Sequence, residues 1–297
     1  MALKQVKNKI IATKKTGQVT KAMEAVSAVK MRKSQEKALK GRPYVRSALR
    51  ILARLANSRD GLAHPFVLPR KIGRKLLVIV TSDKGLAGSV NSAVLKQVDE
   101  LKKNGEVLDA ICIGRKAVEY ATRSKLDILG EYTNISDGVT VSDVDEIAKL
   151  VFENFRNEKY ASVEVVYQNF LSTFEQAPAR RLLLPLDPAE ISFVLESIRP
   201  KTGKYSSEVE MGSHVINYII EPNVEAVLES LIPQLVEIMI YHALIESKAC
   251  EHSARMVAMK NATDKSKELV GSLTVLYNKA RQAGITAEVS EITAGVE

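Results

Sequence analysis

Tryptophan is absent from the 297-residue chain, and aromatic residues make up only 5% of it. Large aromatic side chains supply much of the buried area in many protein cores. Their scarcity therefore disfavours a core of packed sheets and suits long helices, in which Ala, Leu, Val and Met fill narrow seams. Hydrophobic residues form 45% of the chain and charged residues 26%, a composition typical of a globular protein and not of a disordered one.

Cysteine is equally scarce, with only Cys112 and Cys250 and no CxxC pair. Two cysteines cannot build a disulfide framework, so we expect buried free thiols and a reducing compartment. Long apolar runs are missing too. No stretch of about 18 apolar residues predicts a membrane span, and the N-terminus lacks the apolar core of a signal peptide. Any link to a membrane is expected to pass through partners.

Catalytic and metal-binding patterns are not found. The sequence has no HExxH motif, no Cys/His ligand spacing and no GxSxG turn. Its four histidines are His64, His214, His242 and His252. We expect His242 and His252 to be polar residues satisfied within or beside a helical coil, and we predict no metal site and no cofactor.

The positive charge is concentrated at one end. Residues 1–75 hold 20 Lys and Arg against three acidic residues, a net charge of +17, whereas the remainder holds 23 against 32, a net charge of −9. Such a segment usually meets an acidic protein, a membrane surface or nucleic acid. Because Tyr44 is the only aromatic residue in 1–60, base stacking is poorly provided for, and an acidic protein surface is favoured.

Residues 3–57 read as one long helix. At 1.5 Å per residue, about 55 residues span roughly 80 Å. Gly41 and Pro43 interrupt the pattern, and the proline predicts a kink without ending the helix. The apolar residues at helical spacing are Val19, Met23 and Val26, followed by Val45, Leu49 and Leu52.

The other end of the chain carries a heptad seam with alternating steps of three and four residues. Pro222 lies near the start of this region, Pro233 predicts a break or kink, and Gly284 predicts the helix stop. The seam contains several polar or small members, so it should pack less tightly than a Leu/Ile zipper. Its positions are Leu235, Ile238, His242, Ile245, Ala249, His252, Met256, Met259, Thr263, Ser266, Val270, Leu273, Tyr277 and Ala280.

The middle of the chain reads as α/β. Short apolar runs typical of buried parallel strands occur at 75–81, 107–113 and 162–167. Helical patterns lie at 89–103, 115–124 and 142–157. Residues 213–220 could form a last strand, and the stretch 170–212 is not assigned.

These patterns predict the fold class: α/β plus long helices. The N-terminal helix (1–60) and the C-terminal helix (222–297) form an antiparallel two-helix coiled coil. A small Rossmann-like α/β domain (75–220) is inserted between them.

The most distinctive local segment is residues 81–91 (TSDKGLAGSVN), which follows a strand and opens a helix. A glycine-bearing loop in this place could hold a phosphate at the helix N-terminus. It lacks the GxxxxGK[ST] and GxGxxG spacings of nucleotide sites, so a tight turn is the favoured interpretation. Two alternatives stay open at this point: a nucleotide-binding α/β enzyme with coiled-coil arms, and a basic coiled-coil protein that binds nucleic acid.

Several segments resemble the gamma subunits of F-type ATP synthases, and together they span essentially the whole chain. The C-terminal matches, 251–263 (EHSARMVAMKNAT) and 276–292, are the clearest. The others are 11–24, 29–33, 81–91 and 218–222 (YIIEP).

The resemblance implies a non-catalytic rotor-stalk subunit that couples ion flow through the membrane ring to rotary catalysis in the head. The implied partners are the alpha and beta subunits of the catalytic head, the epsilon subunit and the membrane c-ring. Nucleotide would stay on the head subunits. The sequence resembles neither the chloroplast form with its cysteine-bearing insertion nor a precursor with a transit peptide. The implied location is therefore peripheral, on the cytoplasmic side of a bacterial inner membrane.

Positions carried over from the resemblance imply where the partners touch. Lys84 and Ala87 resemble a region that faces an acidic loop of the catalytic subunit, and Tyr218 resembles a position near the membrane ring. The positions that resemble residues coupling rotation to catalysis are Met23, Arg255, Arg281, Gln282, Thr286 and Glu288.

Overall fold

The computed structural model describes residues 3–56, 64–70, 73–187, 221 and 223–294. The chain divides into two units, one formed by residues 1–29 with 255–297 and the other by residues 30–254. The predicted strand at 213–220 lies outside the described residues.

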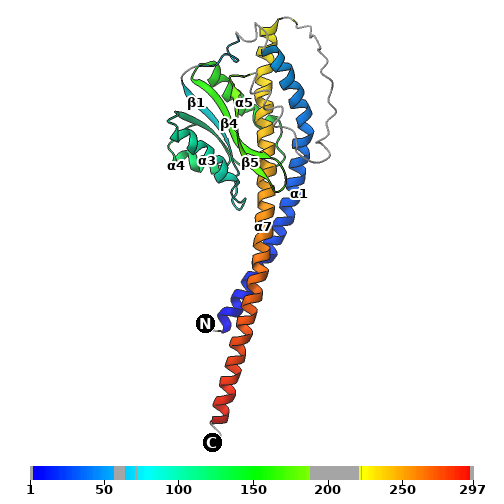
Figure 1. Cartoon of the computed structure of the whole chain (residues 1–297), viewed down its shortest axis with the longest axis vertical. Coiled ribbons are helices and arrows are strands. Elements are labelled where there is room, and N and C mark those ends of the chain that lie inside the picture. The colour runs from blue at the N-terminus through cyan, green and yellow to red at the C-terminus, as the bar shows by residue number, and fades with distance from the viewer. Residues whose placement is uncertain (1–2, 57–63, 71–72, 188–220, 222, 295–297) are drawn as a thin grey trace. The chain divides into compact units, whose positions relative to one another are not determined.

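Two long helices are present, as predicted (Figure 1). The first, α1, runs over Leu3–Ala56, and the last, α7, over Val224–Ala294. The Asn223 side chain caps α7 by accepting a hydrogen bond from the Ala226 N–H at 2.8 Å, as is usual at a helix N-terminus.

The predicted stop at Gly284 is wrong, because α7 continues to Ala294. A single glycine costs a helix only about 1 kcal/mol relative to alanine, and no proline follows it to end the helix. Of the break or kink predicted at Pro233, the break is absent, since this proline lies inside the continuous helix.

In the first unit the two helices pack antiparallel. The hydroxyl groups of Thr20 and Thr263 lie 2.7 Å apart in the buried seam. A Cβ placed on Gly17, three residues earlier in α1, would lie 3.2 Å from Cβ of Ser266, three residues later in α7. Positions that rise along one helix therefore fall along the other, which confirms the antiparallel coil in this unit.

The predicted α7 seam is confirmed by burial in this unit. Thr263 is buried, and the seam positions from Ser266 to Ala280 are partly buried between exposed neighbours. Beyond Ala280, every described residue of α7 is exposed.

The apolar stripe predicted for α1 is wrong in part. Val19 and Val26 are 58% and 56% exposed, whereas Thr20 and Ser27 are 9% and 3% exposed. Small residues face α7 because they allow close approach of the two backbones, and the separation of packed helices depends on the side chains at the contact. Of the predicted stripe, Met23 is half-buried. The side chains of Val45, Leu49 and Leu52 lie outside the description.

The second unit holds a five-stranded sheet in the order β3-β2-β1-β4-β5. Strands β1 to β4 are parallel, and β5 pairs with β4 antiparallel. The strands are β1 (Arg74–Val80), β2 (Leu108–Ile113), β3 (Asp127–Tyr132), β4 (Tyr160–Phe170) and β5 (Gln176–Leu184). The three predicted strands are confirmed. The two edge strands β3 and β5 were not predicted, and β5 lies in the stretch left unassigned.

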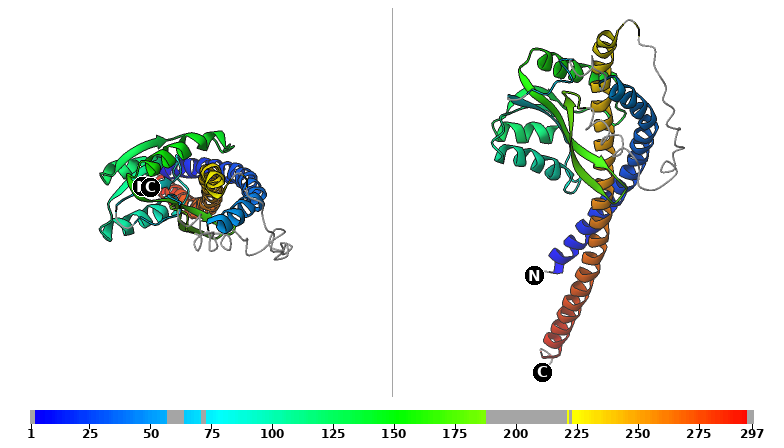
Figure 2. Two further views of the ribbon diagram at one scale, coloured as in Figure 1. Left: turned by 90° about the horizontal axis from the view of Figure 1, so that it is seen from above. Right: turned by 45° about the horizontal axis from the view of Figure 1, so that its top comes forward.

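Helices cover both faces of this sheet (Figure 2). One face packs against α3 (Val90–Lys103) and α4 (Arg115–Arg123), and the other against α5 (Ser142–Arg156) and α7. Successive residues of β1 alternate between the two cores, with Leu77 in one and Leu76 in the other. A strand buried on both faces explains the unbroken apolar run.

Both cysteines are buried free thiols, as predicted. Burial, with a smaller contribution from Glu131, raises the pKa of Cys112 to about 12. Burial also raises the pKa of Cys250 well above its ordinary value. One window of α7 is long and apolar enough to cross a membrane by composition, but 56% of it is buried inside the protein, as expected for a core helix.

Candidate functional site

The strand order creates a switch point between β1 and β4. From β1 the chain proceeds outward to β2 and β3, and then returns to the other side of β1 to form β4. In open parallel sheets, ligands bind in the crevice at the carboxyl ends of the two strands that flank such a point. A nucleotide site in this domain would therefore be expected there.

Helix α7 fills this crevice. The backbone N–H of Gln168 on β4 donates to Ser247 Oγ of α7 at 3.2 Å, and Cys250 Sγ donates to the Gln168 carbonyl at 3.4 Å. Beside these bonds Val90, Phe170, Ala249 and Cys250 form a small buried apolar cluster. Side chains of this chain thus occupy the place that a ligand would take.

Polar groups of the glycine loop 81–91 form hydrogen bonds with other groups of this chain. At the N-terminus of α4, the Ala117 N–H donates to Thr81 Oγ1 at 2.8 Å, and the Arg115 N–H donates to Asp83 Oδ1 at 3.1 Å. Helix N-termini attract anions, and here the anion is the Asp83 carboxylate. Asn91 bonds back to Ser82 through its amide at 2.8 Å.

The cavity at this edge has a volume of about 20 Å³ and is lined by residues such as Ser82, Gly114 and Glu251. Such a volume holds about one water molecule, far less than a nucleotide requires. The structure therefore favours the tight-turn interpretation of the loop over the phosphate site.

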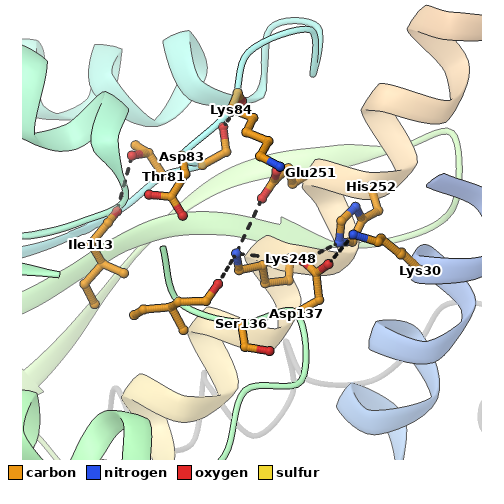
Figure 3. A network of polar contacts seen from close by, with 12 residues as sticks. Lys30, Thr81, Asp83, Lys84, Ile113, Ser136, Asp137, Lys248, Glu251 and His252 are labelled. Carbon is orange, nitrogen blue, oxygen red and sulfur yellow. Dashed lines mark hydrogen bonds and ion pairs between the residues drawn. The ribbon is translucent and has the colours of Figure 1, made fainter. Parts of the chain in front are cut away.

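A charged cluster surrounds Asp137, which lies in the loop between β3 and α5 (Figure 3). Its Oδ2 lies 2.7 Å from Lys30 Nζ of α1, and its Oδ1 lies 2.9 Å from His252 Nε2 of α7. Lys248 Nζ, also on α7, donates to the Ile135 carbonyl at 3.0 Å and lies 3.9 Å from Asp137 Oδ1. Burial alone would raise the pKa of Asp137, but its bonds to Lys30 and His252 and the Lys248 charge lower it to about 2.

Each of the two seam histidines has an acidic neighbour. His252 pairs with Asp137, and His242 Nδ1 lies 3.4 Å from Glu246 Oε1. Among the residues that the structure describes, no cluster of His, Cys, Asp and Glu could hold a metal ion.

The described residues carried over from the resemblance are divided between the two units. In the second unit Lys84 is exposed, and Figure 3 shows its side chain reaching toward Glu251 of α7. Ala87 is only 2% exposed, so its side chain packs inside the protein and offers little surface to a partner. Tyr218 lies outside the described residues.

The other carried-over residues lie in the first unit. Met23 is half-buried on α1, and Arg255 is 8% exposed on α7. Four residues lie on the exposed end of α7: Arg281, Gln282, Thr286 and Glu288. The Thr286 hydroxyl donates to the Gln282 carbonyl at 2.9 Å within the helix, and Ile285 and Val289 are exposed on the same end.

Positive charge lines α1 in the same unit. Its six lysines between positions 4 and 21 are all exposed, and Glu24 is the only acidic residue of α1 there. Exposed apolar side chains lie between them, including Ile11 and Val19 at 45% and 58% exposure. A basic and apolar helix surface of this kind is suited to bind a protein partner.

Sequence reasoning missed Asp137, Lys248 and Ser247. No motif marks them, because Asp137 and Lys248 meet only where the loop after β3 packs against α7, and Ser247 meets Gln168 only where α7 packs against β4. One available signal was His252, a polar residue at a seam position, which requires a buried partner.

The comparisons with known proteins agree with this architecture. The family model for ATP synthase, ATP-synt, matches residues 2–297. The ATP synthase gamma chain of Heliobacterium modesticaldum is 36% identical over 99% of this chain and 97% of its own length. That of Stenotrophomonas maltophilia is 35% identical over 98% and 97%.

Solved structures show the same fold. The central stalk and c-ring structure of the Tetrahymena thermophila mitochondrial ATP synthase contains a chain with a TM-score of 0.62 and 24% identity, covering 82% of this chain and 99% of that one. A chain of the Euglena gracilis mitochondrial ATP synthase has a TM-score of 0.65 and 18% identity, covering 99% and 93%. The full-length match to the family model and to the bacterial relatives shows that the chain belongs to the ATP synthase gamma chain family.

Proposed function

We propose that this chain is the rotating shaft of a proton-translocating F-type ATP synthase. It transmits rotation between a membrane c-ring and a catalytic head of alpha and beta subunits, with the epsilon subunit as a further partner. It lies on the cytoplasmic side of a bacterial inner membrane as a peripheral component. The chain is a non-catalytic subunit, and the nucleotide binds to the head.

The observation that carries this proposal is the surface of the first unit. Past Ala280, α7 is a single exposed helix that still presents apolar side chains, with Ile285, Val289 and Ile292 at 52%, 54% and 68% exposure. An exposed apolar stripe on an isolated helix indicates contact with another protein. A catalytic head that surrounds α7 would cover this apolar stripe. A shallow contact of this kind would still allow α7 to rotate inside the head.

The carried-over residues receive roles within this proposal. Met23 and Arg255 contact the catalytic head near the coil. Four residues contact the head at the exposed end of α7: Arg281, Gln282, Thr286 and Glu288. Lys84 contacts an acidic loop of a catalytic subunit, and Ala87 holds the loop 81–91 of this chain in place. Tyr218 lies near the membrane ring.

The filled crevice supports a non-catalytic role over a nucleotide-binding enzyme. The switch point is occupied by Ser247 and Cys250 of α7, and Asp83 takes the anion position at α4. Because a nucleic-acid binder would want aromatic side chains for stacking, the lysine-rich and apolar surface of α1 favours a protein partner instead.

Met23→Lys tests the coupling role. In the assembled synthase, we expect proton pumping per ATP hydrolysed to fall, because a further cation on the lysine-rich surface of α1 changes the contact with the catalytic head. Substitutions along coupled networks shift coupling by about 0.5–2 kcal/mol. The thermal unfolding of the isolated chain should change little, since Met23 is only half-buried.

The matched control is Val107→Lys, which adds the same charge at a 57% exposed apolar position of the second unit. It should leave the pumping ratio at the wild-type value. Unchanged coupling in Met23→Lys would remove Met23 from the proposed contact.

A further inference from the structure

One loop of the α/β domain holds both long helices within the second unit. Residues 133–141 connect β3 to α5. Two lysines of α1 bond to it, Lys30 through the Asp137 carboxylate at 2.7 Å and Lys37 through the Val139 carbonyl at 3.4 Å. On α7, His252 and Lys248 bond to it at 2.9 Å and 3.0 Å.

The loop itself is firmly seated. Val139 is 1% exposed and belongs to the main hydrophobic core. On its C-terminal side the backbone N–H and the hydroxyl of Thr140 both donate to Asp143 Oδ2, at 2.7 Å and 2.8 Å. The loop can therefore act as a fixed anchor for groups that bond to it.

Asp137 is the point at which the two helices meet the loop. Its two oxygens divide between them, Oδ2 toward Lys30 of α1 and Oδ1 toward His252 of α7, with Lys248 nearby (Figure 3). Carboxylate bonds to charged donors are about twice as strong as neutral ones. One side chain thus links three elements that are distant in sequence.

We propose that Asp137 is a torque clamp, a positioning residue that locks α1 and α7 to the α/β domain so that both helices turn with it. This inference rests on the proposed function, because it assigns a role to the base of the shaft. Helix α7 is also held by the core of the sheet. For α1, the bonds of Lys30 and Lys37 to the loop add a direct link to the domain.

The clamp has a mechanical reason. A two-helix shaft transmits torque fully only if neither helix slides along the other at its base. A carboxylate that bonds to α1 through one oxygen and to α7 through the other opposes such sliding directly.

The test is Asp137→Asn in the assembled synthase, compared with Asp145→Asn. Asp145 pairs with Lys149 at 2.7 Å within α5, on the surface, so the control makes the same substitution but removes only an exposed ion pair within one helix. We expect proton pumping per ATP hydrolysed to fall about two- to ten-fold in Asp137→Asn. ATP hydrolysis should persist, Asp145→Asn should match the wild type, and Asp137→Glu should recover most of the loss.

Lys30→Gln gives a second measurement that does not depend on the folding of the Asp137 variant. The Lys30 side chain is 47% exposed, so its replacement leaves the core intact while it removes the α1 arm of the clamp. A lowered pumping ratio in Lys30→Gln supports the clamp. An unchanged ratio in both Lys30→Gln and Asp137→Asn overturns it.

Hydrogen exchange on the isolated chain separates this inference from the proposed function. Asp137→Asn should speed amide exchange in residues 133–141 and in residues 30–37, whereas Asp145→Asn should not. If the wild-type chain failed to support pumping at all, the shaft function would fall while this exchange result still reported on the clamp. Equal exchange in all variants would mean that Asp137 does not hold α1.

Discussion

Gly114→Ala is expected to cost the second unit about 3 kcal/mol or more of unfolding free energy. Gly114 follows β2 with φ of +91°, and a Cβ there would lie 2.2 Å from the Thr81 carbonyl oxygen. Thr81 cannot retreat, because its backbone N–H is bonded to Ile113 at 2.8 Å and its hydroxyl accepts from Ala117. Urea unfolding of the isolated chain, followed by circular dichroism, measures the loss.

Gly105→Ala is the matched control for this clash. Gly105 also has a positive φ, +79°, but no atom lies within 4 Å of its Cβ position. Its replacement should cost only the backbone strain, about 1 kcal/mol. If the two variants were equally stable, the close packing of the loop 81–91 against the start of α4 would be wrong.

Ala249→Arg is expected to lower the free energy of unfolding by an amount on the order of 4 kcal/mol or more, because the substitution would bury an unpaired charge among apolar side chains. Ala249 is 0% exposed and lies in the cluster with Phe170 and Cys250 that fills the switch point. The variant should unfold at much lower urea concentration, or fail to yield soluble protein.

Val275→Arg provides the control on the same helix. Val275 is 70% exposed, so the same substitution should change stability by about 0.5 kcal/mol or less. A stable Ala249→Arg variant would mean that α7 does not plug the crevice, and the case against a ligand at the switch point would weaken.

Much of this fold could be predicted from the sequence because strong periodicity marks it. The α7 seam is visible from Leu235 to Ala280, β1 contains an unbroken apolar run from Leu76 to Val80, and β2 is apolar apart from Asp109. The α1 stripe was predicted wrongly because apolar side chains such as Val19 were assumed to face the partner helix. Close approach instead places Thr20 and Ser27 in the seam.

The edge strands and the polar contacts were harder to predict. Strand β3 has a half-exposed pattern without strict alternation, and β5 contains Pro178 and two arginines, so neither resembles a buried strand. Asp137 carries no local signal at all. Its role arises only from the packing of the loop against helices more than 100 residues away in both directions.

The stop at Gly284 failed for a related reason. Gly284 predicts the helix stop because glycine often follows the last turn of a helix, but a helix can continue through a single glycine, even without a partner, when no proline intervenes. Under the proposed function, the catalytic head would cover this end. The sequence of one subunit does not contain that surrounding surface.

The most direct test of the central claim measures ATP hydrolysis with and without the catalytic subunits. The purified chain should hydrolyse no ATP, should co-purify with an alpha–beta hexamer, and should raise the hydrolysis rate of that hexamer. Hydrolysis by the chain alone, or a hexamer that neither binds it nor responds to it, would contradict its role as a non-catalytic shaft.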